Sequence, residues 1–177
     1  MTFQAEEFLW YWLFRTQRSL ADAFYVALKE CCQEHSKTYV VTPPQFGVLA
    51  LLDEQEGMTI GSISQKRGVD APTITGIVTR LEQSGLVERR HDRKDRRQVY
   101  VFLTGEGADI MRYLPHVATA LSETMLKGFS QAERQNLIAK LQHIITNLSD
   151  GAPDAENRSG CFPGFLDNEK ARQGENI

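Results

Sequence analysis

The sequence lacks the short motifs on which most enzyme active sites are built. Its 177 residues contain no phosphate loop, no dinucleotide-binding fingerprint, no Gly-x-Ser-x-Gly elbow and no His-Glu-x-x-His or Cys-x-x-Cys metal spacing. The four histidines are scattered along the chain, at positions 35, 91, 116 and 143. These absences favour a binding protein without cofactor or metal over an enzyme.

Long apolar runs are also missing, and cysteines are few. The apolar stretch Phe8–Phe14 is too short to cross a membrane, and acidic residues stand at positions 6 and 7, where a secretion signal carries positive charge. Cys31 and Cys32 are adjacent and Cys161 lies far away, so the three cysteines make no disulfide framework. We therefore expect a cytoplasmic protein.

The charge of the chain is unevenly distributed. A net charge of −3 and a pI of about 5.8 argue, taken alone, against a nucleic-acid partner. Residues 86–104, however, hold six basic and three acidic residues, which gives this segment +3 and leaves −6 for the rest. Because the local field rather than the net charge steers a protein to phosphate, this segment is a candidate for DNA binding. The alternative is a solvated charged loop.

The segment 70–104 carries the strongest structural pattern. Asp70 is placed to cap a helix, with Pro72 in its first turn and Gly85 as its stop. Apolar residues recur between them at helical spacing: Ile74, Ile77, Val78 and Leu81. Alternating apolar residues then predict two strands on either side of the charged loop 91–97: Val87, Val99, Val101 and Leu103. A helix followed by a hairpin with a basic tip predicts a winged helix.

A second, shorter helix precedes this segment. Thr59 can cap it, Ile60 and Ile63 point inward, Gly68 supplies a tight turn and Val69 packs into the corner. Two helices joined by a glycine turn are typical of the helix-turn-helix motif. The pair therefore predicts a DNA-binding unit that covers about residues 42–104.

These residues carry a family resemblance. The run Thr42–Leu52, the helix pair and the stretch HDRKDRRQVYVFLTGEG together resemble the MarR family of winged-helix transcription regulators, over roughly Tyr39–Gly107. The resemblance implies a mostly α fold, a winged helix-turn-helix with a small β-hairpin wing and long N- and C-terminal dimerisation helices. It further implies a DNA-binding transcriptional regulator, a repressor that responds to a ligand and binds a near-palindromic operator as a homodimer.

The candidate DNA contacts lie on the helix pair and on the wing. Within the recognition helix, expected over 70–84, the face opposite the apolar stripe is short or cationic, which suits close approach to base edges and phosphates. In the family, the Asp of an Asp-x-Arg pattern orients the Arg, which enters the minor groove; Asp95 and Arg97 match that pair. The full set of candidates is Ser62, Pro72, Thr73, Thr75, Gly76, Thr79, Arg80, Arg90, Arg93, Lys94, Asp95, Arg96 and Arg97.

The flanking segments predict long helices for dimerisation. Residues 3–36 contain no Gly or Pro and are apolar on more than one face, so this helix needs a second neighbour. Residues 108–148 predict two further helices, with a kink or break at Pro115 and a capping box from Ser130 to Glu133. We expect residues 1–149 to form the MarR-like domain and 150–177, rich in small and polar residues, to form a C-terminal tail.

Two kinds of control site are open. MarR-like regulators commonly bind phenolic or aromatic carboxylate ligands between the dimer helices and the winged-helix body, and an aromatic wall with an Arg suits such an anion. Matching residues are Trp12, Arg15, Arg18, Phe46, Met111 and Tyr113, although aromatics on long helices also serve as plain core. The alternatives are a redox regulator that uses Cys31, Cys32 or Cys161, and a winged-helix module that binds only other proteins.

Overall fold

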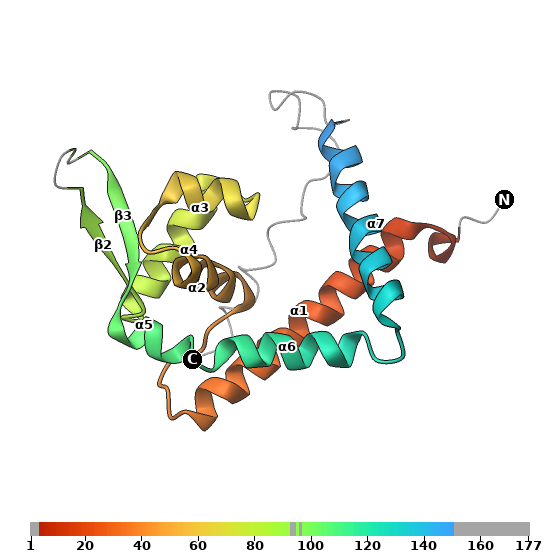
Figure 1. The fold of residues 1–177 in the computed structure, drawn as a ribbon, viewed down its shortest axis with the longest axis horizontal. Helices are drawn as coiled ribbons and strands as arrows, with labels where there is room; N and C mark the ends of the chain where they lie inside the picture. Colours follow the sequence, from red (N-terminus) through yellow and green to blue (C-terminus); the bar gives the residue numbers. More distant parts are fainter. Residues whose placement is uncertain (1–3, 93–94, 96, 151–177) are drawn as a thin grey trace. The chain divides into compact units, whose positions relative to one another are not determined.

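The computed structural model describes residues 4–92, 95 and 97–150 of the chain (Figure 1). The chain divides into two compact units, Met1–Lys127 and Gly128–Ile177. The first unit holds a winged helix-turn-helix and the long N-terminal helix, and the described part of the second holds one helix. The expected fold class, mostly helical with a small antiparallel sheet, is confirmed.

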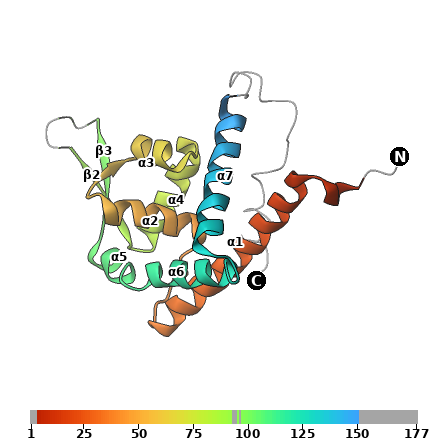
Figure 2. The ribbon, with the colours of Figure 1, turned by 45° about the vertical axis from the view of Figure 1, so that its right-hand side comes forward.

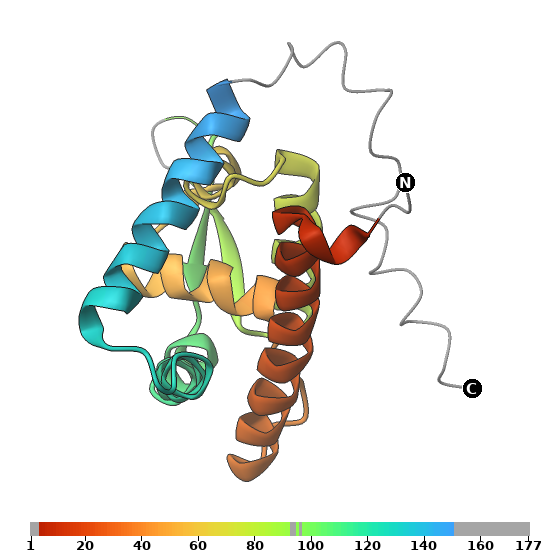
Figure 3. The same ribbon diagram turned by 90° about the vertical axis from the view of Figure 1, so that its right-hand side faces the viewer.

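Helix α1 runs from Leu9 to Glu34 and follows a 3₁₀ turn at Ala5–Glu7. It was expected to begin near residue 3, but the extended backbone of Phe8 separates the turn from the helix. Only its last turns reach the core, through Leu28, Cys31 and Cys32. Figures 2 and 3 show α1 as a long rod beside α2, Pro43–Glu54, and α6, Leu114–Met125, against which it packs.

The helix-turn-helix forms from local hydrogen bonds that the sequence predicted. In α3, Ile60–Arg67, the Thr59 hydroxyl accepts from the N–H of Ser62, and Gly68 turns the chain with a left-handed φ of 62°. Asp70 caps α4, Ala71–Gln83, whose four expected apolar residues are all buried. Gly85 then ends the motif with a φ of 72°.

A three-stranded antiparallel sheet follows, in the order β1-β3-β2. Strands β2, Val87–His91, and β3, Val99–Leu103, are the predicted hairpin, with Arg89 opposite Val101. The two-residue strand β1, Met58–Thr59, pairs with the other edge of β3 and was not expected. Two residues are too few for an alternating pattern, so only the long-range pairing reveals this strand.

The segment after the hairpin corrects one prediction. A single helix was expected from residue 108, with a kink or break at Pro115; the structure has α5, Gly105–Ile110, and then α6, in whose first turn Pro115 lies. A proline has no N–H and clashes with the preceding turn, so the chain breaks before it and restarts. The earlier start comes from a cap, since the Thr104 hydroxyl accepts from the N–H of Gly107 at 3.0 Å, and an added Cβ at Gly107 would lie 2.1 Å from the carbonyl oxygen of Leu86.

The second unit contains α7, Gln131–Asp150. Its start is the predicted capping box: Glu133 accepts from the N–H and hydroxyl of Ser130 at 2.8 and 2.7 Å, and these bonds lower the pKa of Glu133. The apolar face of α7 is exposed at Leu137, Ile138, Leu141, Ile145 and Leu148.

An ion-pair network joins the loop after α1 to α5. The Lys37 ammonium, with only 13% of its side chain exposed, donates to Glu106 at 2.9 Å and to Asp109 at 2.8 Å, and Tyr39 donates to Glu106 at 2.7 Å. The hydrogen bonds to Asp109 and Glu106 raise the pKa of Lys37 to about 12. The hydrogen bonds from Tyr39 and Lys37 lower the pKa of Glu106, and the one from Lys37 lowers the pKa of Asp109. This network fixes the end of α1 on the winged-helix body.

Lys37→Met is expected to lower the thermal midpoint at pH 7 by more than Arg112→Met does. Because the folded state lowers the carboxyl pKa values, their stabilisation is present above the usual pKa values of 4.5 and 3.8 and is lost as the pH falls below them. Thermal unfolding from pH 7 to pH 3 should therefore show the difference between Lys37→Met and wild type closing in acid. Arg112 is the control, 75% exposed and 3.8 Å from Asp109. A constant difference across this range would contradict the assignment.

Candidate nucleic-acid interface

The recognition helix α4 has its outer face fixed by its cap. Asp70 accepts from the backbone N–H of Thr73 at 2.9 Å and from the Thr73 hydroxyl at 2.7 Å, and these two bonds lower the pKa of Asp70. The carboxylate is thus ionised and held at the helix N-terminus. With the buried stripe inward, the centre of the outer face is formed by Pro72, Gly76, Thr79 and Gln83, flanked by Thr73, Thr75 and Arg80.

The threonine hydroxyls on this face already donate to their own helix. Thr75 donates to the Ala71 carbonyl at 2.8 Å and Thr79 donates to the Thr75 carbonyl at 2.9 Å. Their methyl groups and oxygen lone pairs remain as the contact groups, which suits a thymine methyl or a base amine donor. Thr79 also accepts from Arg89 at 3.0 Å, so this residue links α4 to β2 as well as facing outward.

Two features of the helix pair differ from the expected list. Gln83 is exposed on the same face as Gly76 and was missed, although its position in the helical repeat could have found it. Ser62 is exposed at the start of α3, but its oxygen lies 3.0 Å from that of Thr59, the residue that caps the helix. Ser62 thus has a structural partner in addition to its predicted contact with DNA.

Gly76→Ala is expected to raise the thermal midpoint and to weaken DNA binding. An added Cβ would meet only Arg80 Nη2, at 3.7 Å, so the fold accepts it, and alanine gains about 1 kcal/mol over glycine inside a helix. The same methyl group stands at the centre of the face that would approach the groove. Thermal unfolding and titration against a fluorescent duplex measure the two effects, and Ala71→Gly, at the edge of the face, is the control. Tighter binding by Gly76→Ala would place this face away from DNA.

The wing turn is organised by aspartates. The Asp92 carboxylate accepts from the N–H of Asp95 at 2.8 Å, and the Asp95 carboxylate accepts from the N–H of Arg97 at 3.0 Å. Asp95 and Arg97 are both exposed. The predicted partners Arg93, Lys94 and Arg96 lie outside the described residues. Asp95 therefore holds the main chain of Arg97, which fixes where its side chain leaves the turn.

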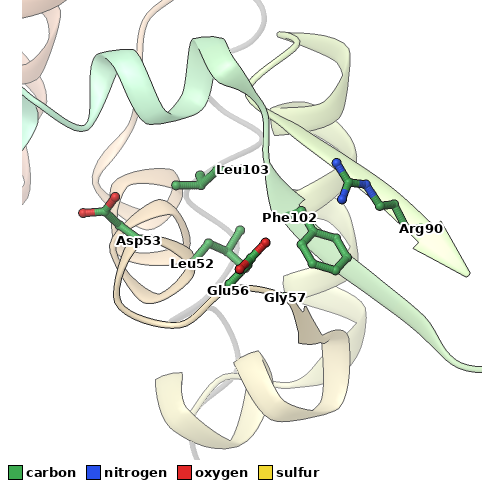
Figure 4. Close-up of a pocket in the computed structure, with 7 residues that line it drawn as sticks. All are labelled: Leu52, Asp53, Glu56, Gly57, Arg90, Phe102 and Leu103. Atoms are coloured by element: carbon green, nitrogen blue, oxygen red, sulfur yellow. The ribbon is translucent and has the colours of Figure 1, made fainter. Parts of the chain in front are cut away.

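Arg90 lies over the ring of Phe102, with the guanidinium carbon 4.6 Å from the ring centroid, and pairs with Glu88. Its side chain remains 57% exposed, so it can reach a phosphate. Arg90 and Phe102 border a shallow depression of about 250 Å³, seen in Figure 4, whose other lining residues are Leu52, Asp53, Glu56, Gly57 and Leu103. This depression contains none of the six residues predicted to bind a ligand.

Those six residues lie in different surroundings within this unit. Trp12 is exposed and donates to the Glu6 carbonyl at 2.8 Å, and Arg15 lies over the rings of Tyr11 and Trp12. Arg18 is exposed, while Phe46 packs edge-to-face on Phe24 and Met111 is core. Tyr113 stacks on His35, with 3.6 Å between ring centroids.

The cysteines of α1 are buried. Burial raises the pKa of the Cys31 thiol, and Cys32 and Glu34 raise it further. The His35 Nδ1 lies 2.9 Å from the Cys31 carbonyl, so it acts there as a donor rather than as a base for the thiol at 3.9 Å. Cys161 lies outside the described residues. In the described part of the chain, no three His, Cys, Asp or Glu side chains gather as a metal site, and no helix there is long and apolar enough to cross a membrane.

Comparison with known proteins agrees with this geometry. The model of the MarR family matches residues 41–99. The HTH-type transcriptional regulator TtmR of Methylorubrum extorquens is 34% identical over 139 residues, which span 77% of this chain and 67% of TtmR.

Solved structures share the fold. The repressor CouR bound to a 23-mer DNA duplex superposes with a TM-score of 0.69 and 25% identity, over 82% of this chain and 99% of CouR. BpsR of Bordetella bronchiseptica, whose DNA binding is regulated by 6-hydroxynicotinic acid, superposes with a TM-score of 0.70 and 22% identity, over 86% of this chain and all of BpsR. The chain belongs to the MarR family of winged-helix transcriptional regulators, which bind DNA.

Proposed function

We propose that the protein is a homodimeric repressor that binds a near-palindromic operator. Each α4 enters a major groove, and each wing turn at Asp95–Arg97 reaches the adjacent minor groove. The observation that carries the proposal is the small outer face of α4, centred on Gly76, on the helix whose other face is wholly core. A helix with this division can lie deep in a groove without disturbing the fold.

Dimerisation is supported by apolar surface that the chain leaves exposed. The exposed apolar residues of α1 include Leu9, Trp10, Trp12, Phe14 and Val26, and α7 exposes the apolar face described above. Surfaces of this kind are typical of obligate interfaces, which resemble a domain core cut in half. Two copies related by a two-fold axis would present two recognition helices to two half-sites.

Selection from a random duplex library tests the proposal directly. The expected result is an inverted repeat with half-sites about one helical turn apart, bound with an affinity that falls steeply with salt. A single, non-repeated site would overturn the dimeric mode. No salt-dependent affinity for any duplex would favour the alternative of a protein-interaction module.

Control by a small aromatic acid is part of the proposal. BpsR, which shares the fold, has its DNA binding regulated by 6-hydroxynicotinic acid, and Trp12 with Arg15 offers ring and charge partners near the expected dimer interface. A ligand releases the operator only if it prefers the dimer form that does not bind DNA. Titrating salicylate and related acids against the protein–operator complex is the test, and release of DNA is the expected result.

The thiol alternative has less support. Reactive cysteines are exposed and have a lowered pKa, whereas Cys31 is buried with a raised one. Operator affinity before and after peroxide, in wild type and in Cys31→Ser, Cys32→Ser and Cys161→Ser, separates the two kinds of control. A response to peroxide that is lost with one cysteine, with none to aromatic acids, would replace ligand control by redox control.

A further inference from the structure

Arg89 joins the wing to the recognition helix. It lies in β2, and its guanidinium makes an ion pair with Glu82 through Nη1 and donates to the Thr79 hydroxyl at 3.0 Å through Nη2. Both partners belong to α4, three residues apart and therefore on neighbouring turns of one side. Only 27% of the Arg89 side chain is exposed. One residue of the hairpin thus holds α4 at two points.

The chemistry of this contact requires a planar fork. A guanidinium presents two N–H groups in fixed directions and can bind a carboxylate and a hydroxyl at once, whereas an ammonium is a point charge. The Thr79 hydroxyl donates to the Thr75 carbonyl at 2.9 Å, so its lone pair is directed to receive Arg89. The chain itself connects α4 to β2 only through the short turn at Gly85. The fork is therefore a second connection that restrains rotation about this turn.

The neighbouring residue Arg90 behaves differently. Successive side chains of a strand point to opposite faces, so Arg90 lies on the other face of the hairpin, over Phe102. More than half of its side chain is exposed, whereas Arg89 is committed to α4. The two arginines of β2 thus have separate roles.

We propose that Arg89 is a positioning residue that sets the angle of the wing to the recognition helix, and that it does not itself bind phosphate. This inference rests on the proposal that α4 and the wing contact the same operator. Two contacts on one duplex reinforce each other only when their relative geometry is fixed beforehand, because a mobile wing loses freedom on binding. Arg89 supplies that fixed geometry in the free protein.

The first test reverses the pair. Arg89→Glu places two carboxylates together and should weaken binding of the selected operator roughly tenfold to a hundredfold. Adding Glu82→Arg restores the ion pair in the opposite sense, without the bond to Thr79, and should return most of the lost affinity. The control is Glu82→Arg alone, which places a second guanidinium against Arg89 and should bind weakly although it adds positive charge. A double variant as weak as Arg89→Glu alone would overturn the proposal.

The second test uses the neutral variant Arg89→Gln in full-length protein and separates positioning from plain stabilisation. Its salt dependence should match that of wild type, because no phosphate contact is lost, whereas Arg90→Gln should lower the slope of log K against log salt by about one per subunit. Hydroxyl-radical cleavage, which reports on the sugars that line the minor groove, should show lost protection in Arg89→Gln, whereas protection of guanine N7 in the major groove from dimethyl sulfate should remain.

The outcomes distinguish this inference from the proposed function. A reduced salt slope for Arg89→Gln would make Arg89 a phosphate contact, and equal loss of protection in both grooves would make it only a stabilising residue. Either result overturns the inference while the operator model stands. A wild-type footprint confined to one groove would instead overturn the operator model on which the inference rests.

Discussion

Replacing Arg97 with alanine is expected to remove most operator binding while leaving the fold unchanged. Arg97 is exposed at the wing turn, so its side chain contributes little to stability. A narrow minor groove concentrates negative potential, and an inserted guanidinium exploits it. At roughly 1 kcal/mol or more for each of two subunits, the loss is about thirtyfold or greater. Anisotropy with a fluorescent operator measures the loss, and thermal unfolding checks the fold.

Arg112→Ala is the control that separates loss of a contact in the groove from loss of charge. Arg112 is also exposed and carries the same charge, but it lies beside Asp109 at the end of α5. Its replacement should change operator affinity by less than about threefold, in keeping with a screened charge away from the DNA. The salt slope should fall by about one per subunit for Arg97→Ala and stay constant for Arg112→Ala. Equal losses for both variants would show that Arg97 acts only through net charge.

A second prediction for the wing concerns Asp95, whose carboxylate accepts from the N–H of Arg97. Asp95→Ala removes a negative charge, which electrostatics alone would favour, but it also removes the acceptor that shapes the turn. We expect it to weaken operator binding. Asp95→Asn keeps an acceptor oxygen, so its operator affinity should be at least that of Asp95→Ala and closer to that of wild type. Tighter binding by Asp95→Ala than by wild type, at fixed salt, would show that Asp95 does not position Arg97.

The double variant Leu141→Asp and Ile145→Asp is expected to abolish the dimer and, with it, operator binding. Leu141 is 38% exposed and Ile145 is 64% exposed on α7, so charges at these positions would be harmless in a monomer. In a dimer they would bury unpaired carboxylates, which costs several kcal/mol. Since an inverted repeat needs both recognition helices, operator affinity should fall by about a hundredfold or more. Light scattering after gel filtration gives the oligomeric state.

Ala139→Asp is the matched control for this pair, because it adds a carboxylate to the opposite side of α7. It should leave both the dimer and the operator affinity unchanged. Unfolding of the double variant would also support the interface, since two exposed substitutions do not unfold a protein whose monomer is self-sufficient. A stable dimer with unchanged affinity would remove α7 from the interface and leave α1 as the candidate.

The elements that the sequence predicted well are those held by contacts between near neighbours. Asp70, Thr59 and Ser130 each bond to the N–H or side chain three residues further on, and each begins a helix in the structure. The two positive φ angles of the motif fall on predicted turn glycines. Such features depend on a few consecutive residues, so pattern and spacing are enough to find them.

Other features could not be predicted because the deciding partner is far along the chain. Strand β1 exists only through its pairing with β3, and α5 begins at Gly105 in a corner where Gly107 meets the Leu86 carbonyl. Thr79 lies on the outer face, as its helical position predicted, but nothing near it in sequence predicts the Arg89 fork ten residues later. The predicted ligand residues remain a prediction, and their spacing alone does not show that Phe46 packs on Phe24 or that Met111 lies in the core.

Residue patterns were enough to assign this chain to the winged helix-turn-helix proteins of the MarR family and to locate its basic wing. Helix periodicity, caps and turn glycines are local properties, and the wing motif is specific. Packing in three dimensions was needed to establish which polar groups are committed to the fold and which remain for DNA. Lys37 reaches Glu106 across 69 positions, and Arg89 clamps α4 while its neighbour Arg90 stays exposed. Such contacts depend on how elements pack, because the energy of a salt bridge or hydrogen bond is set by geometry and burial rather than by residue type.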